Sequence, residues 1–154
     1  MWQELFANLA VTAIVLIAWT HASERTSRQG PRLRSILFGA AMAAGTVGSM
    51  MMAFEAAPGV YFDLRAPLLA VTALFGGVPA AMVAATAAFL YRLSLGGAVW
   101  AGGIQIALSV GIGLLGCVLC RRRTIRYVDV GILAALIGVS NAALILQLPL
   151  DSQD

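Results

Sequence analysis

The segment that decides the fold is DLRAPLLAVTALFGGVPAAMVAATAAFLYR, which occupies residues 63–92. It is apolar except near its two ends, where it carries Arg65 and Arg92, and its middle reads GGVP at residues 76–79. An ionisable residue in or beside bilayer hydrocarbon is costly, so it is a functional-site candidate by default. If the chain folds back at the glycine-proline break, the two guanidinium groups meet on one side of the membrane and form a pocket for a small anion.

The composition identifies an integral membrane protein. Of the 154 residues, 60% are hydrophobic and only 11% are charged, and the mean hydropathy is +0.89. A soluble domain has about 25% charged residues. Several apolar runs reach the length of about 18 residues that indicates a membrane-spanning helix. The net charge of +3 comes from arginines in loops beside these runs, so it is a topology signal and predicts no nucleic-acid partner.

The apolar runs predict an all-α fold, a polytopic transmembrane helix bundle of about five spans. The first run is interpreted as a retained helix rather than a secretory signal, because its only early charge is Glu4 and a signal needs a positive start. We expect helices over residues 5–20, 35–54, 98–120 and 128–148, a broken helical region over 66–95, and a short loop over 55–63.

Loop charges determine the expected path of the broken region. The loops after the first and fourth helices are both arginine-rich, which places both on the cytoplasmic side. Two loops on one side need an even number of crossings between them, so residues 66–95 must cross twice or not at all. As one rod they span about 45 Å, enough for two short arms but not for two full spans.

We therefore predict a hairpin, or re-entrant pair, with its hinge at Gly76, Gly77 and Pro79. Glycine permits unusual backbone angles, and proline removes a helical hydrogen bond. Arg65 and Arg92 then both lie on the extracytoplasmic side. The alternative is a straight rod in which one basic loop breaks the charge rule, and the two arginines are then about 40 Å apart.

Small residues at every fourth position predict close packing of the membrane helices. Three runs have this spacing and together predict a compact bundle: Ala40-Ala44-Gly48, Ala80-Ala84-Ala88 and Gly103-Ala107-Gly111.

Arg65 and Arg92 are the strongest candidates for ligand binding, because an arginine fork matches a carboxylate with two hydrogen bonds. The alternative for each is an arginine that extends to the lipid headgroups. Asp63 is interpreted as a partner of Arg65, as a helix cap, or as a further ligand contact. Gln105 and Asn141 are polar groups inside apolar helices, which either hydrogen-bond across helices or line the pocket.

The sequence predicts neither enzyme activity nor a metal or cofactor site, because it contains no catalytic or phosphate-binding motif. Cys117 and Cys120 form a C-x-x-C pair, but there is no second pair and His21, the one histidine, is far away in sequence. We interpret the cysteines as small apolar residues on one helix face, and leave palmitoylation or redox sensing open.

An ordered set of motifs runs through the middle of the chain: FDLR at 62–65, PLLA at 67–70, LFGGVPA at 74–80, LYRL at 90–93, LGG at 95–97 and AG at 101–102. Together they resemble the LytS/YhcK-type five-transmembrane receptor domain. The likeness covers about residues 33–148. It implies a sensory input domain, placed in relatives before a cytoplasmic histidine kinase of a phosphorelay or before a diguanylate cyclase. The FDLR form is more similar to the cyclase-linked branch.

Some kinase-linked relatives sense small carboxylates such as pyruvate, through arginines that match Arg65 and Arg92. They also use a cysteine and a serine, which the resemblance places at Gly103 and Ile106. Neither residue is polar, so this chain departs from the pyruvate-sensing pattern. Relatives also continue past the fifth helix with another span and an output domain.

The first hypothesis is therefore a receptor domain in the bacterial plasma membrane. Residues 1–150 form one transmembrane sensor domain and 151–154 a short acidic tail, with the output domain outside this chain. The expected partners are a small carboxylate-like anion, membrane lipid and, as an open alternative, a second copy in a homodimer. Two other hypotheses remain: a substrate-binding membrane subunit of a small-molecule transporter, and a structural membrane module without a ligand.

Overall fold

The computed structural model describes residues 2–26, 29–57, 60–62, 64–96, 99–120 and 131–140. Its elements are four long helices, a short apolar helix and a pair of short strands. They are α1 (Trp2–Thr26), α2 (Pro31–Met51), β1 (Phe54–Ala57), β2 (Val60–Phe62), α3 (Arg65–Leu95), α4 (Val99–Cys120) and the helix Gly131–Ser140. The four long helices are apolar and long enough to cross a membrane. The predicted all-α polytopic bundle is confirmed.

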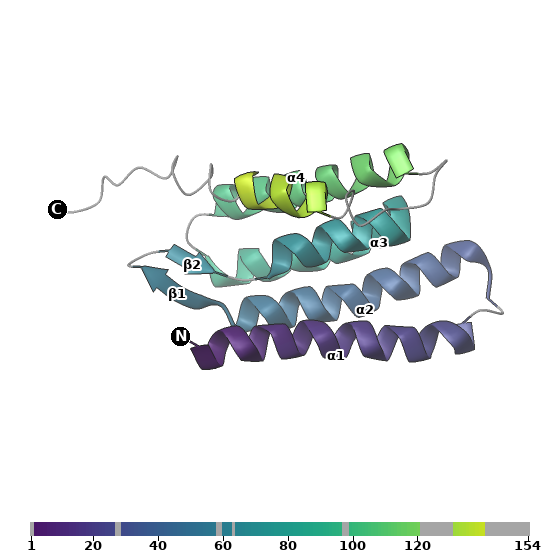
Figure 1. The fold of residues 1–154 in the computed structure, drawn as a ribbon, viewed down its shortest axis with the longest axis horizontal. Coiled ribbons are helices and arrows are strands. Elements are labelled where there is room, and N and C mark those ends of the chain that lie inside the picture. The colour runs from purple at the N-terminus through teal and green to yellow at the C-terminus, as the bar shows by residue number, and fades with distance from the viewer. Residues whose placement is uncertain are drawn as a thin grey trace.

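The long helices are stacked in chain order, with α1 against α2, α2 against α3 and α3 against α4 (Figure 1). The helix Gly131–Ser140 packs against α3, where Ile137 shares a buried cluster with Ala66 and Ala70. Because α3 contacts α2 on one side and α4 on the other, it is the most buried of the four spans. This central position makes α3 the element that α2, α4 and the helix Gly131–Ser140 all contact.

The helix α3 changes direction at Gly77, which has φ +66° and ψ −163°. This backbone region is open essentially only to glycine. Pro79 follows, where its missing N–H does not interrupt the second helical arm because the first turn of a helix has no acceptor for it. The break therefore divides α3 into a first arm, residues 65–76, and a second arm, residues 78–95.

Contacts with α2 show that the two arms run in opposite directions. The Ser35 hydroxyl, near the start of α2, donates to the Gly76 carbonyl at 2.6 Å. Near the end of α2, the Ser49 hydroxyl accepts from the Leu64 N–H at 3.0 Å. The first arm therefore lies antiparallel to α2. The second arm returns beside the same helix, because Ala84 and Ala88 share a buried cluster with Ala43 and Met50.

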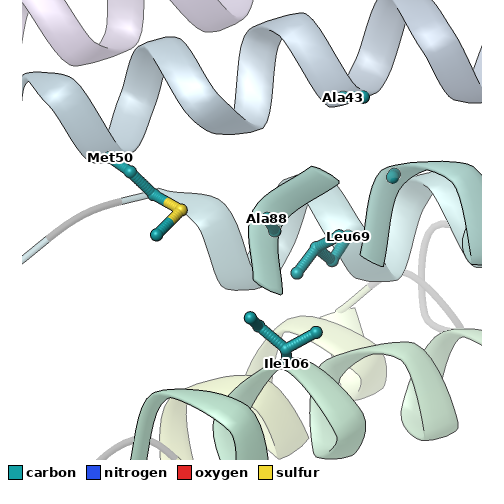
Figure 2. Packing of buried hydrophobic residues seen from close by; sticks show 6 residues of the cluster. Ala43, Met50, Leu69, Ala88 and Ile106 are labelled. Atoms are coloured by element: carbon teal, nitrogen blue, oxygen red, sulfur yellow. The ribbon is translucent and has the colours of Figure 1, made fainter. Parts of the chain in front are cut away.

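The central core cluster contains residues from both arms of α3. Leu69 of the first arm and Ala88 of the second lie together with Ile106 of α4 (Figure 2). In a straight helix these two α3 residues would be about 28 Å apart at 1.5 Å per residue. Their common cluster confirms the predicted hairpin and excludes the straight rod.

The segment 55–63, expected as a loop, instead contains most of a small β-hairpin. The strands β1 and β2 pair antiparallel, with Phe54 opposite Phe62 and Glu55 opposite Tyr61. The chain has to reverse direction over a few residues between α2 and α3, and pairing the strands satisfies backbone groups that an open loop would leave to water. The helix α1 also begins earlier and ends later than expected, at Trp2 and Thr26.

Of the three predicted runs of small residues, the one in α3 packs throughout, whereas those in α2 and α4 pack only at Gly48 and Gly103, against Val11 and Phe89. Ala80, Ala84 and Ala88 are all fully buried. In α2 the buried positions include Gly39 and Ala43, whereas the predicted Ala40 and Ala44 are exposed. In α4 the buried glycines are Gly102, Gly113 and Gly116, whereas the predicted Ala107 and Gly111 are exposed. The buried small residues of α2 are displaced by one position from the predicted run, and those of α4 lie on a different face of the helix.

Candidate ligand site at the open end of the hairpin

The start of α3 positions Arg65. The helix begins at Arg65 itself, with Leu64 as its N-cap residue. The Leu64 side chain makes no capping hydrogen bond. The Leu64 N–H instead donates to the Ser49 hydroxyl of α2. The next residue, Ala66, is buried, as is Leu68. These contacts hold the first turn against the bundle and leave Arg65 partly buried at the end of the hairpin.

Arg65 contacts α4 through a side-chain hydrogen bond. Its Nη2 atom donates to the Oε1 atom of Gln105. Both residues are partly buried, and the bond connects the start of α3 to the second turn of α4. A bond between membrane helices is one of the two roles predicted for Gln105. It also places an amide group beside the guanidinium.

Arg92 contacts the same part of α4 from the other arm. It lies in the last turn of α3, which Gly96 ends with φ +71°. A Cβ atom built on Gly102 would lie 2.7 Å from the Arg92 Nε atom and 3.0 Å from its Cγ atom. The Arg92 side chain therefore lies directly over Gly102, which is buried and whose lack of a side chain makes this approach possible.

The hairpin brings the two arginines to one face of α4. Gly102 and Gln105 are three residues apart on that helix, and this spacing places them on the same face, one turn apart. The Nε atoms of Arg65 and Arg92 are both buried. Arg65 and Arg92 are 27 residues apart in the chain. The hairpin brings them to neighbouring turns of α4, as predicted.

Helix ends of both polarities lie at this site, because the second arm of α3 ends where the first arm and α4 begin. α4 begins at Val99, and α3 begins at Arg65, so the N-termini of two helices lie at the same end of the bundle (Figure 1). A helix N-terminus favours a negative charge and disfavours a positive one. The helix dipole therefore disfavours the charge of Arg65 in a first turn and favours that of Arg92 in a last turn. The arrangement is suited to binding a small anion with two or more hydrogen bonds.

Other predicted residues differ in their placement. Asp63 lies outside the described residues, as do Asn141 and the side chain of Cys120. Ile106, which the family resemblance matched with a polar residue, is buried in the apolar core. Gly103 faces the Phe89 ring of the second arm. The polar side chain of α4 that bonds Arg65 is Gln105.

Two polar residues near the site were not predicted from the sequence. Ser49 and Asn8 are buried at the end of α2 and near the start of α1, and both take part in the hydrogen bonds that precede Arg65. A signal for them exists, because a polar side chain inside an apolar membrane helix usually makes an interhelical hydrogen bond. The sequence contains several such residues, however, and nothing in it selects these two.

The fold and the site together define a polytopic membrane domain that gathers two arginines at the open end of a helical hairpin. The family model described as "5TMR of 5TMR-LYT" matches residues 13–154. The chain belongs to this family of five-transmembrane receptor domains, which serve as membrane input domains of sensor kinases rather than as catalytic domains. The predicted family is confirmed. Comparison with curated proteins and with solved structures gave no match.

Proposed function

We propose that this domain senses a small carboxylate-like anion on the extracytoplasmic side of the bacterial plasma membrane. It passes the signal to a cytoplasmic histidine kinase or diguanylate cyclase module. The observation that carries this proposal is the convergence of Arg65 and Arg92 on one face of α4.

The sidedness follows from the distribution of charge. Arg32 and Arg34 are exposed at the start of α2, which is the end of the bundle where the α3 hairpin turns. Arginine-rich connections face the cytoplasm. The opposite end, which carries Arg65 and Arg92, is then extracytoplasmic, and a solute from outside reaches the arginines without crossing the bilayer.

Signalling requires the ligand to prefer one packing of the bundle over another. The two arginines lie on different arms of α3, on either side of the Gly77 break. The first arm is hydrogen-bonded to α2 at both of its ends, through Ser35 and Ser49. An anion held by both arginines would fix the second arm relative to this unit and so favour one arrangement of the hairpin.

The test is thermal unfolding of the detergent-solubilised chain in the presence of small monocarboxylates and dicarboxylates, with chloride at matched ionic strength as reference. A ligand at one hundred times its Kd stabilises the folded state by about 2.7 kcal/mol. We expect stabilisation of the wild-type chain by at least one carboxylate and none in Arg65→Ala or Arg92→Ala.

Matched controls are Arg32→Ala and Arg34→Ala, which remove the same charge from exposed positions at the other end of the bundle. Both should respond to carboxylate like the wild type. The proposal is refuted if no carboxylate stabilises the wild-type chain, or if the stabilisation persists in both site variants.

A further inference from the structure

A buried hydrogen-bonded junction connects α1 and α2 to the start of α3. At its centre is Ser49, which is fully buried. Its hydroxyl accepts a hydrogen bond from the Leu64 N–H at 3.0 Å, and its main-chain carbonyl accepts one from the Asn8 Nδ2 atom at 3.5 Å. Asn8 is also buried, with an exposed fraction of 1%. One serine thus contacts both the Asn8 side chain of α1 and Leu64, the residue immediately before Arg65.

The hydroxyl of Ser49 is used differently from other buried hydroxyls of the described bundle. Thr46 and Thr72 donate to the carbonyls of Met42 and Leu68, four residues earlier in their own helices. Those bonds are local and place no constraint on a neighbouring helix. The Ser49 hydroxyl instead accepts from a backbone N–H that is 15 residues away in the chain.

The bond to Leu64 determines where α3 begins. The N–H groups at the start of a helix have no acceptor within the helix, and inside a membrane an unsatisfied one is costly. Ser49 supplies the acceptor for the N-cap residue, so the first turn is held at that point of α2. Because Arg65 is the first residue of the helix, a displacement of Ser49 displaces the base of the Arg65 side chain.

Asn8 extends the junction to the outermost helix of the stack. Two further contacts between α1 and α2 are apolar, namely Val11 against Gly48 and Trp19 against Phe38. Apolar contacts are non-directional, whereas the hydrogen bond from Asn8 joins one residue of α1 to one residue of α2. The Asn8 Oδ1 atom is buried and has no hydrogen-bond partner among the described residues, which is costly in this setting. Stability of the bundle alone does not explain this amide.

We propose that Ser49 is a positioning residue for the arginine site and that Asn8 couples the position of α1 to it. The ligand-dependent part of this inference rests on the proposed function. The junction makes Arg65 sensitive to α1, because Asn8 bonds Ser49 of α2 and Ser49 in turn holds Leu64.

The test compares Ser49→Ala with the control Thr46→Val, a buried hydroxyl of the same helix that has only a local bond. Hydrogen–deuterium exchange of the full chain in detergent reads the protection of the Leu64 amide without any ligand. Carboxylate affinity is measured in parallel. In Ser49→Ala we expect rapid exchange at Leu64 and about tenfold weaker affinity, as the loss of one hydrogen bond implies. Thr46→Val should stay within about twofold of the wild type.

Two further variants complete the test. Ser49→Thr keeps the hydroxyl and should restore both the protection of Leu64 and the affinity. Asn8→Leu removes the amide and should raise the exchange of Leu64 by less than Ser49→Ala. If Ser49→Ala does not fold, Ser49→Cys, which keeps the volume with a weak acceptor, replaces it with the same expectations.

The outcomes separate the two proposals. Wild-type exchange at Leu64 in Ser49→Ala overturns the positioning role, and so does raised exchange with unchanged carboxylate affinity. Unchanged exchange in Asn8→Leu overturns the coupling to α1. If no carboxylate binds the wild-type chain, the proposed function fails, and the exchange of Leu64 in Ser49→Ala still decides whether Ser49 holds the start of α3.

Discussion

Replacing Gly77 by alanine tests the hairpin on which the site depends. Gly77 has φ +66° and ψ −163°, and a Cβ atom built there would meet nothing within 4 Å. The penalty of Gly77→Ala is therefore confined to the backbone, with no steric clash added. A residue other than glycine in this region costs about 1–3 kcal/mol.

Gly111→Ala is the matched control. Gly111 lies inside α4, is exposed, and also has open space where a Cβ would be. In a regular helix, alanine is more favourable than glycine by about 1 kcal/mol. The two substitutions add the same methyl group without a clash, and we expect their free energies of unfolding to differ by about 2–4 kcal/mol.

The assay is unfolding in mixed micelles by increasing mole fraction of sodium dodecyl sulfate, followed by the fluorescence of the native tryptophans. Gly77→Ala should unfold at lower dodecyl sulfate than the wild type, and Gly111→Ala at an equal or higher one. The reasoning fails if Gly77→Ala is as stable as Gly111→Ala, because that result is the one expected of a continuous helix through residue 77.

Three more substitutions test the contacts around the hairpin. Gly39→Ala would place a Cβ atom 2.7 Å from the Cα and carbonyl oxygen of Ala80, so we expect a loss of about 1–3 kcal/mol in the same titration, and wild-type stability would contradict this close approach. Gly102→Ala would place a Cβ atom 2.7 Å from the Arg92 Nε atom. Since that neighbour is a flexible side chain, carboxylate affinity measured by calorimetry should fall while the unfolding midpoint changes little, and unchanged affinity would argue against Arg92 in the site. Ser35→Ala removes the donor to the carbonyl at the hairpin turn and should cost about 1 kcal/mol of unfolding free energy; a midpoint equal to that of the wild type would show that this bond adds nothing.

The features predicted correctly are those with a direct chemical signature along the chain. Hydropathy identifies the membrane helices, because transfer to hydrocarbon depends on composition. The break at Gly77 is readable because few other residues adopt its backbone angles. The location of Arg65 and Arg92 at the same end of the bundle follows from the break and from the charges of two loops, without knowledge of any side-chain contact.

The sequence could not determine which face each helix turns toward its neighbours. In water, the polar side of a helix marks its exposed face, but lipid is as apolar as leucine and removes that signal. The expected stripe with Ala40 and Ala44 was for this reason displaced from the observed one with Gly39 and Ala43. Ser49 acquires its role for the same reason: only the tertiary packing of α2 against α3 places its hydroxyl at the Leu64 N–H. Composition and backbone stereochemistry thus specify the spans and the turn, whereas the fit of side chains between helices decides the contacts that build the site.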